Sequence, residues 1–145
     1  MINSRKIEDL LPGVDKLCRA FIAGCREQGI DVIITSTYRD GASQDALYAQ
    51  GRTKAGPIVT NAKAGQSFHN YRCAFDFVPI ANGKADWNNI ITFGKCGRVA
   101  KALGLEWAGD WTKFKELAHC QYTGGLSLAD LQAGKRIIFD TNPKA

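Results

Sequence analysis

Histidine is scarce in this sequence of 145 residues, which contains only two, at positions 69 and 119. No apolar run reaches the roughly 18 residues that suggest a membrane-spanning helix, so we expect none. The first residues, Met1 to Asp9, are polar and lack the apolar segment of a secretory signal peptide. We therefore expect the protein to be made and to accumulate in the cytoplasm.

The five cysteines include no Cys-x-x-Cys pair, and their number is odd. Both facts argue against a disulfide scaffold and against a cysteine-based zinc knuckle. Cys18 and Cys25 are seven residues apart on an expected helix, where cysteine acts as a small buried hydrophobe. Cys73 and Cys120 lie beside the candidate site residues described below, so a nucleophilic role is the alternative for these two.

No dense lysine or arginine cluster accompanies the net charge of +5. A basic protein suggests an acidic partner, but the dispersed charge argues against nucleic acid. Bacterial cell wall, with its peptide carboxylates and anionic polymers, is the other candidate partner for a basic protein. The sequence shows no internal repeat, and its length predicts one domain, residues 1–145, which we expect to be monomeric.

Hydrophobic periodicity and turn residues predict a mixed α+β chain. Helices are expected over residues 4–28, divided at Pro12, and over 43–51 with Ser43 as its N-cap, 88–103 and 126–134. Strands are expected over residues 30–38, 73–78 with Pro79 ending the strand, 105–107 and 136–139. The tail, 140–145, is expected to be loose, and the basic loop 52–66 is expected to line a site.

One of these strands contains an aspartate among apolar residues. Alternation places Phe75 and Phe77 on one face and Asp76 on the other, with Ala74 and Val78. An ionised carboxylate in such surroundings costs several kcal/mol, roughly, unless it is compensated. A metal ion or an arginine would compensate it.

The two histidines supply the rest of a metal-binding set. His69, Asp76 and His119 match the three-ligand composition of catalytic zinc sites, which leave a fourth position open. Glu116 is then a free carboxylate three residues before a ligand, available as a base. For Glu116 and His119 to face one site, the chain must turn before His119, leaving it at the start of a strand.

The pattern Ser67-x-His69 with Asp76, followed by Glu116-x-x-His119, resembles the zinc peptidases of the D-alanyl-D-alanine carboxypeptidase and L-alanyl-D-glutamate endopeptidase family. The resemblance spans roughly residues 35–121 and includes the segments 36–39, 104–107 and 109–111. Phage endolysins of this group are similar in size. Two departures, Arg72–Cys73 and Cys120, concern the fit of a substrate, since neither is a presumed ligand position.

The resemblance implies an α+β fold with a small antiparallel sheet flanked by helices, as in Hedgehog-like D,D-peptidases. It also implies one zinc ion per chain, held by His69, Asp76 and His119. Glu116 would take a proton from water and pass it to the leaving amine. Arg39 would stabilise the oxyanion.

Four residues of the expected site have a structural alternative. Arg39 is either a cation facing the substrate or a surface arginine paired with Asp40 or Asp45. Gln44 either contacts the substrate or forms a structural hydrogen bond. Ser67 would support a ligand or contact the substrate, and Trp111 would form a wall of the cleft or pack in the core.

Three functions remain open at this point. The first is an L-alanyl-D-glutamate endopeptidase of peptidoglycan, acting as a phage-type endolysin after holin-type release from the cytoplasm. The second is a D-alanyl-D-alanine carboxypeptidase or dipeptidase. The third is a zinc module that binds cell wall without catalysis, against which Glu116 argues, because a closed structural site needs no base. No membrane insertion is expected of any of them.

Overall fold

A five-stranded antiparallel sheet organises the computed structural model, which describes residues 1–139. Its main strands lie in the order β1 (Asp31–Ser36), β2 (Ala74–Ala81), β5 (His119–Gln121) and β4 (Glu106–Trp107), and β3 (Lys84–Ala85) pairs with β2. Within the described residues, no helix is long and apolar enough to span a bilayer. The expected α+β class is confirmed, whereas the expectation for the tail falls outside the described residues.

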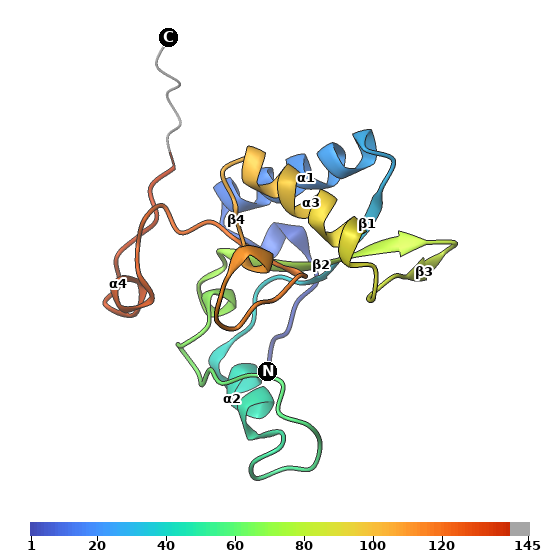
Figure 1. Ribbon diagram of the computed structural model, residues 1–145. Helices are drawn as coiled ribbons and strands as arrows, with labels where there is room; N and C mark the ends of the chain where they lie inside the picture. The colour runs from blue at the N-terminus through green and yellow to red at the C-terminus, as the bar shows by residue number, and fades with distance from the viewer. Residues whose placement is uncertain (140–145) are drawn as a thin grey trace.

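Helices cover the sheet unequally. α1 (Pro12–Glu27) and α3 (Ile90–Ala102) lie side by side on one face, and α2 (Gly41–Ala49) lies on the other side, near the N-terminus (Figure 1). α4 (Leu128–Gln132) lies apart from these three helices (Figure 1). The described part of the chain also contains three short 3₁₀ helices: η1 (Ile7–Asp9), η2 (Phe68–Tyr71) and η3 (Ala108–Asp110). Pro12 divides the N-terminal helical segment as predicted.

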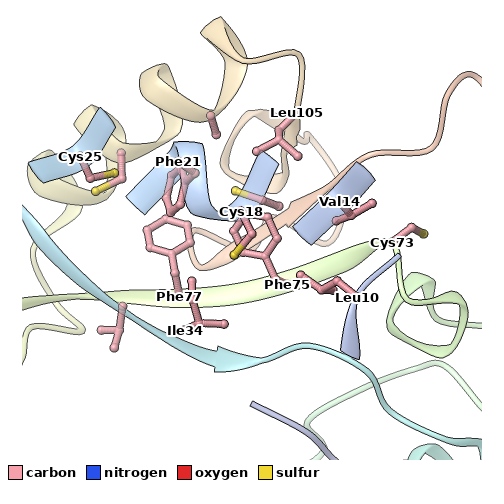
Figure 2. Packing of buried hydrophobic residues seen from close by; sticks show 14 of the residues in the cluster. Leu10, Val14, Cys18, Phe21, Cys25, Ile34, Cys73, Phe75, Phe77 and Leu105 are labelled. Atoms are coloured by element: carbon pink, nitrogen blue, oxygen red, sulfur yellow. The ribbon is translucent and has the colours of Figure 1, made fainter. Parts of the chain in front are cut away.

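The hydrophobic core lies between α1, α3 and β2. The ring of Phe21 on α1 lies 5.5 Å from that of Phe75 and 4.8 Å from that of Phe77, measured between centroids (Figure 2). All three side chains are fully buried. The predicted alternation along β2 is therefore confirmed, and Asp76 points to the opposite face.

The prediction that Pro79 ends this strand is wrong, because β2 continues to Ala81. Pro79 pairs with Val32 of β1, and its carbonyl accepts a hydrogen bond from the amide of Asp86 on the other edge. The proline nitrogen faces that same edge, between the segments paired with β5 and β3. The missing N–H costs no hydrogen bond of the β1–β2 ladder; it removes only the bond that would return to Asp86, just past the end of β3.

Two further local predictions are wrong. Residues 136–139 form no strand; Phe139 instead stacks on Tyr122 at a centroid distance of 5.3 Å. Ser43 is not the N-cap of α2, since the carboxylate of Asp40 accepts the amide hydrogen of Ser43 at 2.8 Å. An aspartate is an equally good N-cap, so composition alone did not separate the two.

A β-bulge at the end of β1 shapes the polar face of the sheet. The register passes from Ile34 opposite Phe77 directly to Ser36 opposite Asp76, which leaves Thr35 unpaired. Such a bulge bends the strand and redirects the residues that follow. The end of β1 is thereby brought to Asp76 and to the site built around it.

Candidate metal centre and active site

Asp76 and His119 are brought together by strand register. They are directly opposed in the β2–β5 pair, so their side chains emerge on the same face. The Nδ1 atom of His119 lies 3.1 Å from Oδ1 of Asp76. The Nε2 atom of His69, from η2, lies 3.1 Å from the same oxygen. One ligand atom from each residue thus falls within a group spanning at most 4.8 Å.

The orientation of His69 is fixed by both ends of its segment. Ser67 caps η2 by accepting the amide hydrogen of His69 at 3.3 Å, and Asn70 completes a capping box. The ring Nδ1 lies 2.8 Å from the carbonyl oxygen of Thr37, just past the β1 bulge. Because a carbonyl only accepts, Nδ1 carries the hydrogen, and neutral His69 presents the lone pair of Nε2 to Asp76.

His119 is held through the other ring nitrogen. Its Nε2 lies 2.8 Å from Oε1 of Gln121, which leaves Nδ1 facing Asp76. The turn before it is also fixed, since the indole of Trp107 donates to the carbonyl of Leu117 at 2.8 Å. That indole lies so close to Gly97 and Gly109 that a β-carbon at either position would overlap it. His119 begins β5 after a turn, as predicted.

These contacts provide a test of whether a metal fits. Two imidazole lone pairs and one carboxylate oxygen converge at 3.1 Å, and lone pairs repel unless a cation lies among them. In the absence of metal, protons take the place of the cation among these groups. Burial opposes ionisation of His119, yet the contact with Asp76 raises the pKa of His119. Burial also opposes ionisation of Asp76, yet the two histidines hold its pKa below its usual range. Metal binding displaces such protons. The donor set fits a divalent ion such as Zn²⁺.

Glu116 lies beside this set but is not part of it. Its Oε2 is 3.7 Å from Nδ1 of His119, and 57% of its side chain is exposed. It faces an open cavity of about 470 Å³, which His119 also lines. A carboxylate in this position can exchange protons with a substrate group in the cavity. The role of Glu116 as base stays a prediction.

Two segments that are distant in the sequence line the cavity. Residues 58–62, in the loop expected to line the site, belong to one segment together with Ser67. Trp111 and Phe114 belong to the other segment. The ring of Trp111 lies 5.7 Å from that of His119, and its side chain is half-buried. Contacts of Ser67 and Trp111 with a substrate stay predictions, although both side chains line the cavity.

Arg39 is held by the polar side chains of Gln44 and Ser36, which we call the Arg39 cage, and not by the aspartates considered as partners. Its Nη1 donates to Oε1 of Gln44 at 3.0 Å and its Nη2 to Oγ of Ser36 at 3.1 Å. Its buried Nε has no partner among the described residues. Burial lowers the pKa of Arg39, while Asp76 and Glu116 act in the opposite direction. Asp40 and Asp45 instead accept backbone amide hydrogens.

Gln44 is fully buried, and both ends of its amide are bonded. Oε1 accepts from Arg39, and Nε2 donates to the carbonyl of Ala62 at 2.8 Å. It therefore joins Arg39 to the loop that lines the cavity. Of the two roles considered for Gln44, this geometry supports the structural one.

The cysteines are fully buried and free. Burial raises the pKa of Cys73 to about 12, and burial with the nearby Asp76 raises that of Cys120 well above its usual value. Thiols in this state are poor nucleophiles. The geometry favours packing for all five.

Thr37, Trp107, Gln121 and Glu106 were given no role from the sequence, although the segments 36–39 and 104–107 were part of the family resemblance. The contributions of Thr37 and Trp107 depend on a bulge and on packing between glycines, which the sequence analysis did not predict. The spacing His119-x-Gln121 on a strand was a usable signal, because alternate residues share a face. The pairing of Glu106 with Gln121 required knowledge of the strand order.

Comparison with solved structures supports the fold. The Serratia marcescens L-Ala D-Glu endopeptidase ChiX superposes with a TM-score of 0.63 at 18% identity, over 81% of this chain and 84% of that one. The vancomycin resistance D,D-pentapeptidase VanY, solved in complex with Zn(II), gives 0.61 at 16% identity, over 86% of this chain and 78% of that one. At these identities the likeness shows the fold alone.

Sequence comparison gives closer relationships. This chain is 41% identical over 128 residues to the peptidoglycan L-alanyl-D-glutamate endopeptidase CwlK of Bacillus subtilis (strain 168), covering 78% of this chain and 73% of that protein. It is 28% identical over 124 residues to the L-alanyl-D-glutamate peptidase of Listeria phage A118, covering 84% of this chain but 40% of that protein. Residues 60–122 match the profile of the D-alanyl-D-alanine carboxypeptidase family, peptidase M15. The resemblance noted from the motifs is thus confirmed: the protein is a hydrolase that belongs to the M15 peptidase family.

Proposed function

We propose that this protein is a zinc peptidase that hydrolyses the L-alanyl-D-glutamate bond of peptidoglycan stem peptides. The observation that carries the proposal is the convergence of His69, Asp76 and His119 beside the exposed carboxylate of Glu116, in an open cavity. The endopeptidase of Bacillus subtilis, 41% identical to this chain, supports the choice of bond. We propose one zinc ion per chain.

The proposed mechanism assigns a distinct task to each residue. Zinc held by the three ligands would polarise the scissile carbonyl and acidify a water molecule. Glu116 would accept the proton of the attacking water and deliver it to the leaving amine. Arg39, held by Gln44 and Ser36, would place positive charge near the developing oxyanion, where losing one donor typically costs about 2.7–4 kcal/mol. Ser67 and Trp111 would contact the substrate.

The principal alternative is release of the terminal D-alanine by carboxypeptidase chemistry. The match to the D-alanyl-D-alanine carboxypeptidase family profile supports this second possibility. A wall-binding module without catalysis is less consistent with the geometry, since three protein ligands beside an open cavity leave room for a reacting water.

Digestion of purified peptidoglycan, followed by mass spectrometry of the fragments, tests the proposal. Endopeptidase action should create new amino groups on glutamate residues, whereas carboxypeptidase action should release free D-alanine. Protein carrying Glu116→Gln serves as the control for contaminating activity. Release of reducing sugars without new amino groups would contradict both peptidase assignments.

We further propose that the protein acts as a phage-type endolysin, reaching the wall after holin-type release if it is phage-encoded. The relative from Listeria phage A118 supports this role. Purified protein added to permeabilised bacteria should reduce turbidity, and the same protein confined to the cytoplasm should do so only when a holin is co-expressed. Lysis of intact cells from within, without any holin, would contradict the release step.

A further inference from the structure

A line of polar side chains crosses three strands on the face that carries the metal centre. Asp76 opposes His119 in the β2–β5 pair, and Gln121 opposes Glu106 in the β5–β4 pair. His119 and Gln121 are two residues apart on one strand and so share a face. The contacts follow this order: Nε2 of His119 lies 2.8 Å from Oε1 of Gln121, and Nε2 of Gln121 lies 2.7 Å from Oε2 of Glu106.

The hydrogen bonds along this line all donate in one direction, from His119 to Gln121 and from Gln121 to Glu106. Glu106 is exposed, and its carboxylate oxygens accept the hydrogen bond from Gln121. The amide of Gln121 must therefore turn its NH₂ group toward Glu106 and its carbonyl oxygen toward His119. That carbonyl also only accepts, so the hydrogen of neutral His119 is placed on Nε2. The lone pair is left on Nδ1, which faces Asp76 and His69.

We propose that Gln121 and Glu106 are positioning residues that hold His119 as a metal ligand through Nδ1. The inference rests on the proposed zinc site. Gln121 is 3% exposed and His119 is 6% exposed, so bulk water is a poor substitute for the amide oxygen. The exposed Glu106 acts at a distance, by preventing the amide from rotating into the orientation that would offer NH₂ to the imidazole.

Zinc affinity measures the proposed role independently of catalysis. Competition with a chromophoric chelator should show zinc binding weakened about 10–100-fold by Gln121→Met, which keeps the length of the side chain and removes both hydrogen bonds. Glu106→Gln should weaken it less, in the same direction, because the amide of Gln121 is then free to turn. Gln28→Met is the matched control: Gln28 is exposed at the end of α1 and should leave affinity unchanged.

An exchange of the two side chains sharpens the test. In the double variant Glu106→Gln with Gln121→Glu, the new carboxylate accepts from His119, and the new amide donates to that carboxylate. The hydrogen of His119 stays on Nε2, so this variant should bind zinc more tightly than Gln121→Met. A role limited to filling space predicts no such recovery, and equal affinities would overturn the proposal.

Nitrogen NMR of the zinc-loaded protein reads the histidines directly, and only two are present. Wild-type protein should show a protected Nε2–H on His119 and a protected Nδ1–H on His69. Gln121→Met should lose protection at His119 alone, with a thermal melt verifying that the variant is folded. Unchanged zinc affinity and an unchanged His119 signal in folded Gln121→Met would overturn the inference. So would a Gln121→Met variant whose zinc affinity is unchanged and whose only defect is a raised KM for peptidoglycan hydrolysis. Failure of the wild-type protein to bind zinc would instead refute the proposed function.

Discussion

At the scale of single residues, the site separates the groups that can hold a metal from the group that can move a proton. Nδ1 of His119 is 3.1 Å from Asp76 but 3.7 Å from Glu116. His69 and His119 are buried, whereas Glu116 is largely exposed to the cavity. Substitutions at these positions should therefore affect metal content and rate in different ways.

Glu116→Gln keeps the size of the side chain and removes its basicity. The variant should retain about one zinc per chain and lose activity by about 10²–10⁴-fold, as is typical of a general base. His69→Ala should lose metal and activity together. Metal analysis beside rates of peptidoglycan hydrolysis makes the comparison. Loss of zinc from Glu116→Gln would make Glu116 a ligand, and near-full activity would exclude it as the base.

Gln44→Leu tests the cage around Arg39. The change leaves an Arg39 donor and the carbonyl of Ala62 unpaired, so unfolding free energy in urea should fall by about 1–3 kcal/mol. Hydrolysis should slow as well, because Arg39 loses its position, while zinc content should not change. Gln28→Leu, at an exposed site, is the control. A loss of stability with an unchanged rate would show that Arg39 takes no part in catalysis.

At the scale of elements, β2 divides its two faces between stability and chemistry. Phe75 and Phe77 pack against α1, and Asp76, between them in sequence, faces the candidate metal centre. Register, rather than helix packing, aligns Asp76 with His119. The packed face can therefore be altered without changing a proposed metal ligand.

Phe21→Ala on α1 should destabilise the fold by about 3–5 kcal/mol, the usual cost of removing a buried aromatic ring. Phe114→Ala is a matched control, because Phe114 is 73% exposed and the change should stay within about 0.5 kcal/mol. Urea unfolding of zinc-free protein measures both. Equal effects of the two substitutions would contradict the assignment of the core to the α1 side of the sheet.

At the scale of the whole molecule, the five cysteines report on the integrity of the fold. Each is fully buried and free, and burial raises the pKa of Cys18 to about 12. A thiol-specific chromogenic disulfide should therefore react with none of them in the folded protein at neutral pH, and with all five in denaturant. Rapid reaction of one thiol in folded protein would contradict the packed core described here.

The elements whose signals are local were predictable from the sequence. The proline at the start of α1, the alternation along β2 and the helix expected over 126–134, where α4 forms, depend on signals that act over a few residues. Two of the predictions that were wrong depended on distant partners. Pro79 is tolerated within β2 because of where β5 and β3 stop, and the segment 136–139 packs without pairing.

The sequence by itself indicated which side chains this protein can offer to a metal, because its two histidines and Asp76, which lies among apolar residues, fall in the motifs of the family resemblance. Family membership also followed from the motifs. Only the tertiary structure decided which nitrogen of each histidine faces the site, since that depends on the carbonyl of Thr37 and the amide of Gln121. The contact with Thr37 depends on a bulge, and the orientation of the Gln121 amide depends on Glu106, which strand order places opposite it; both are properties of the assembled sheet.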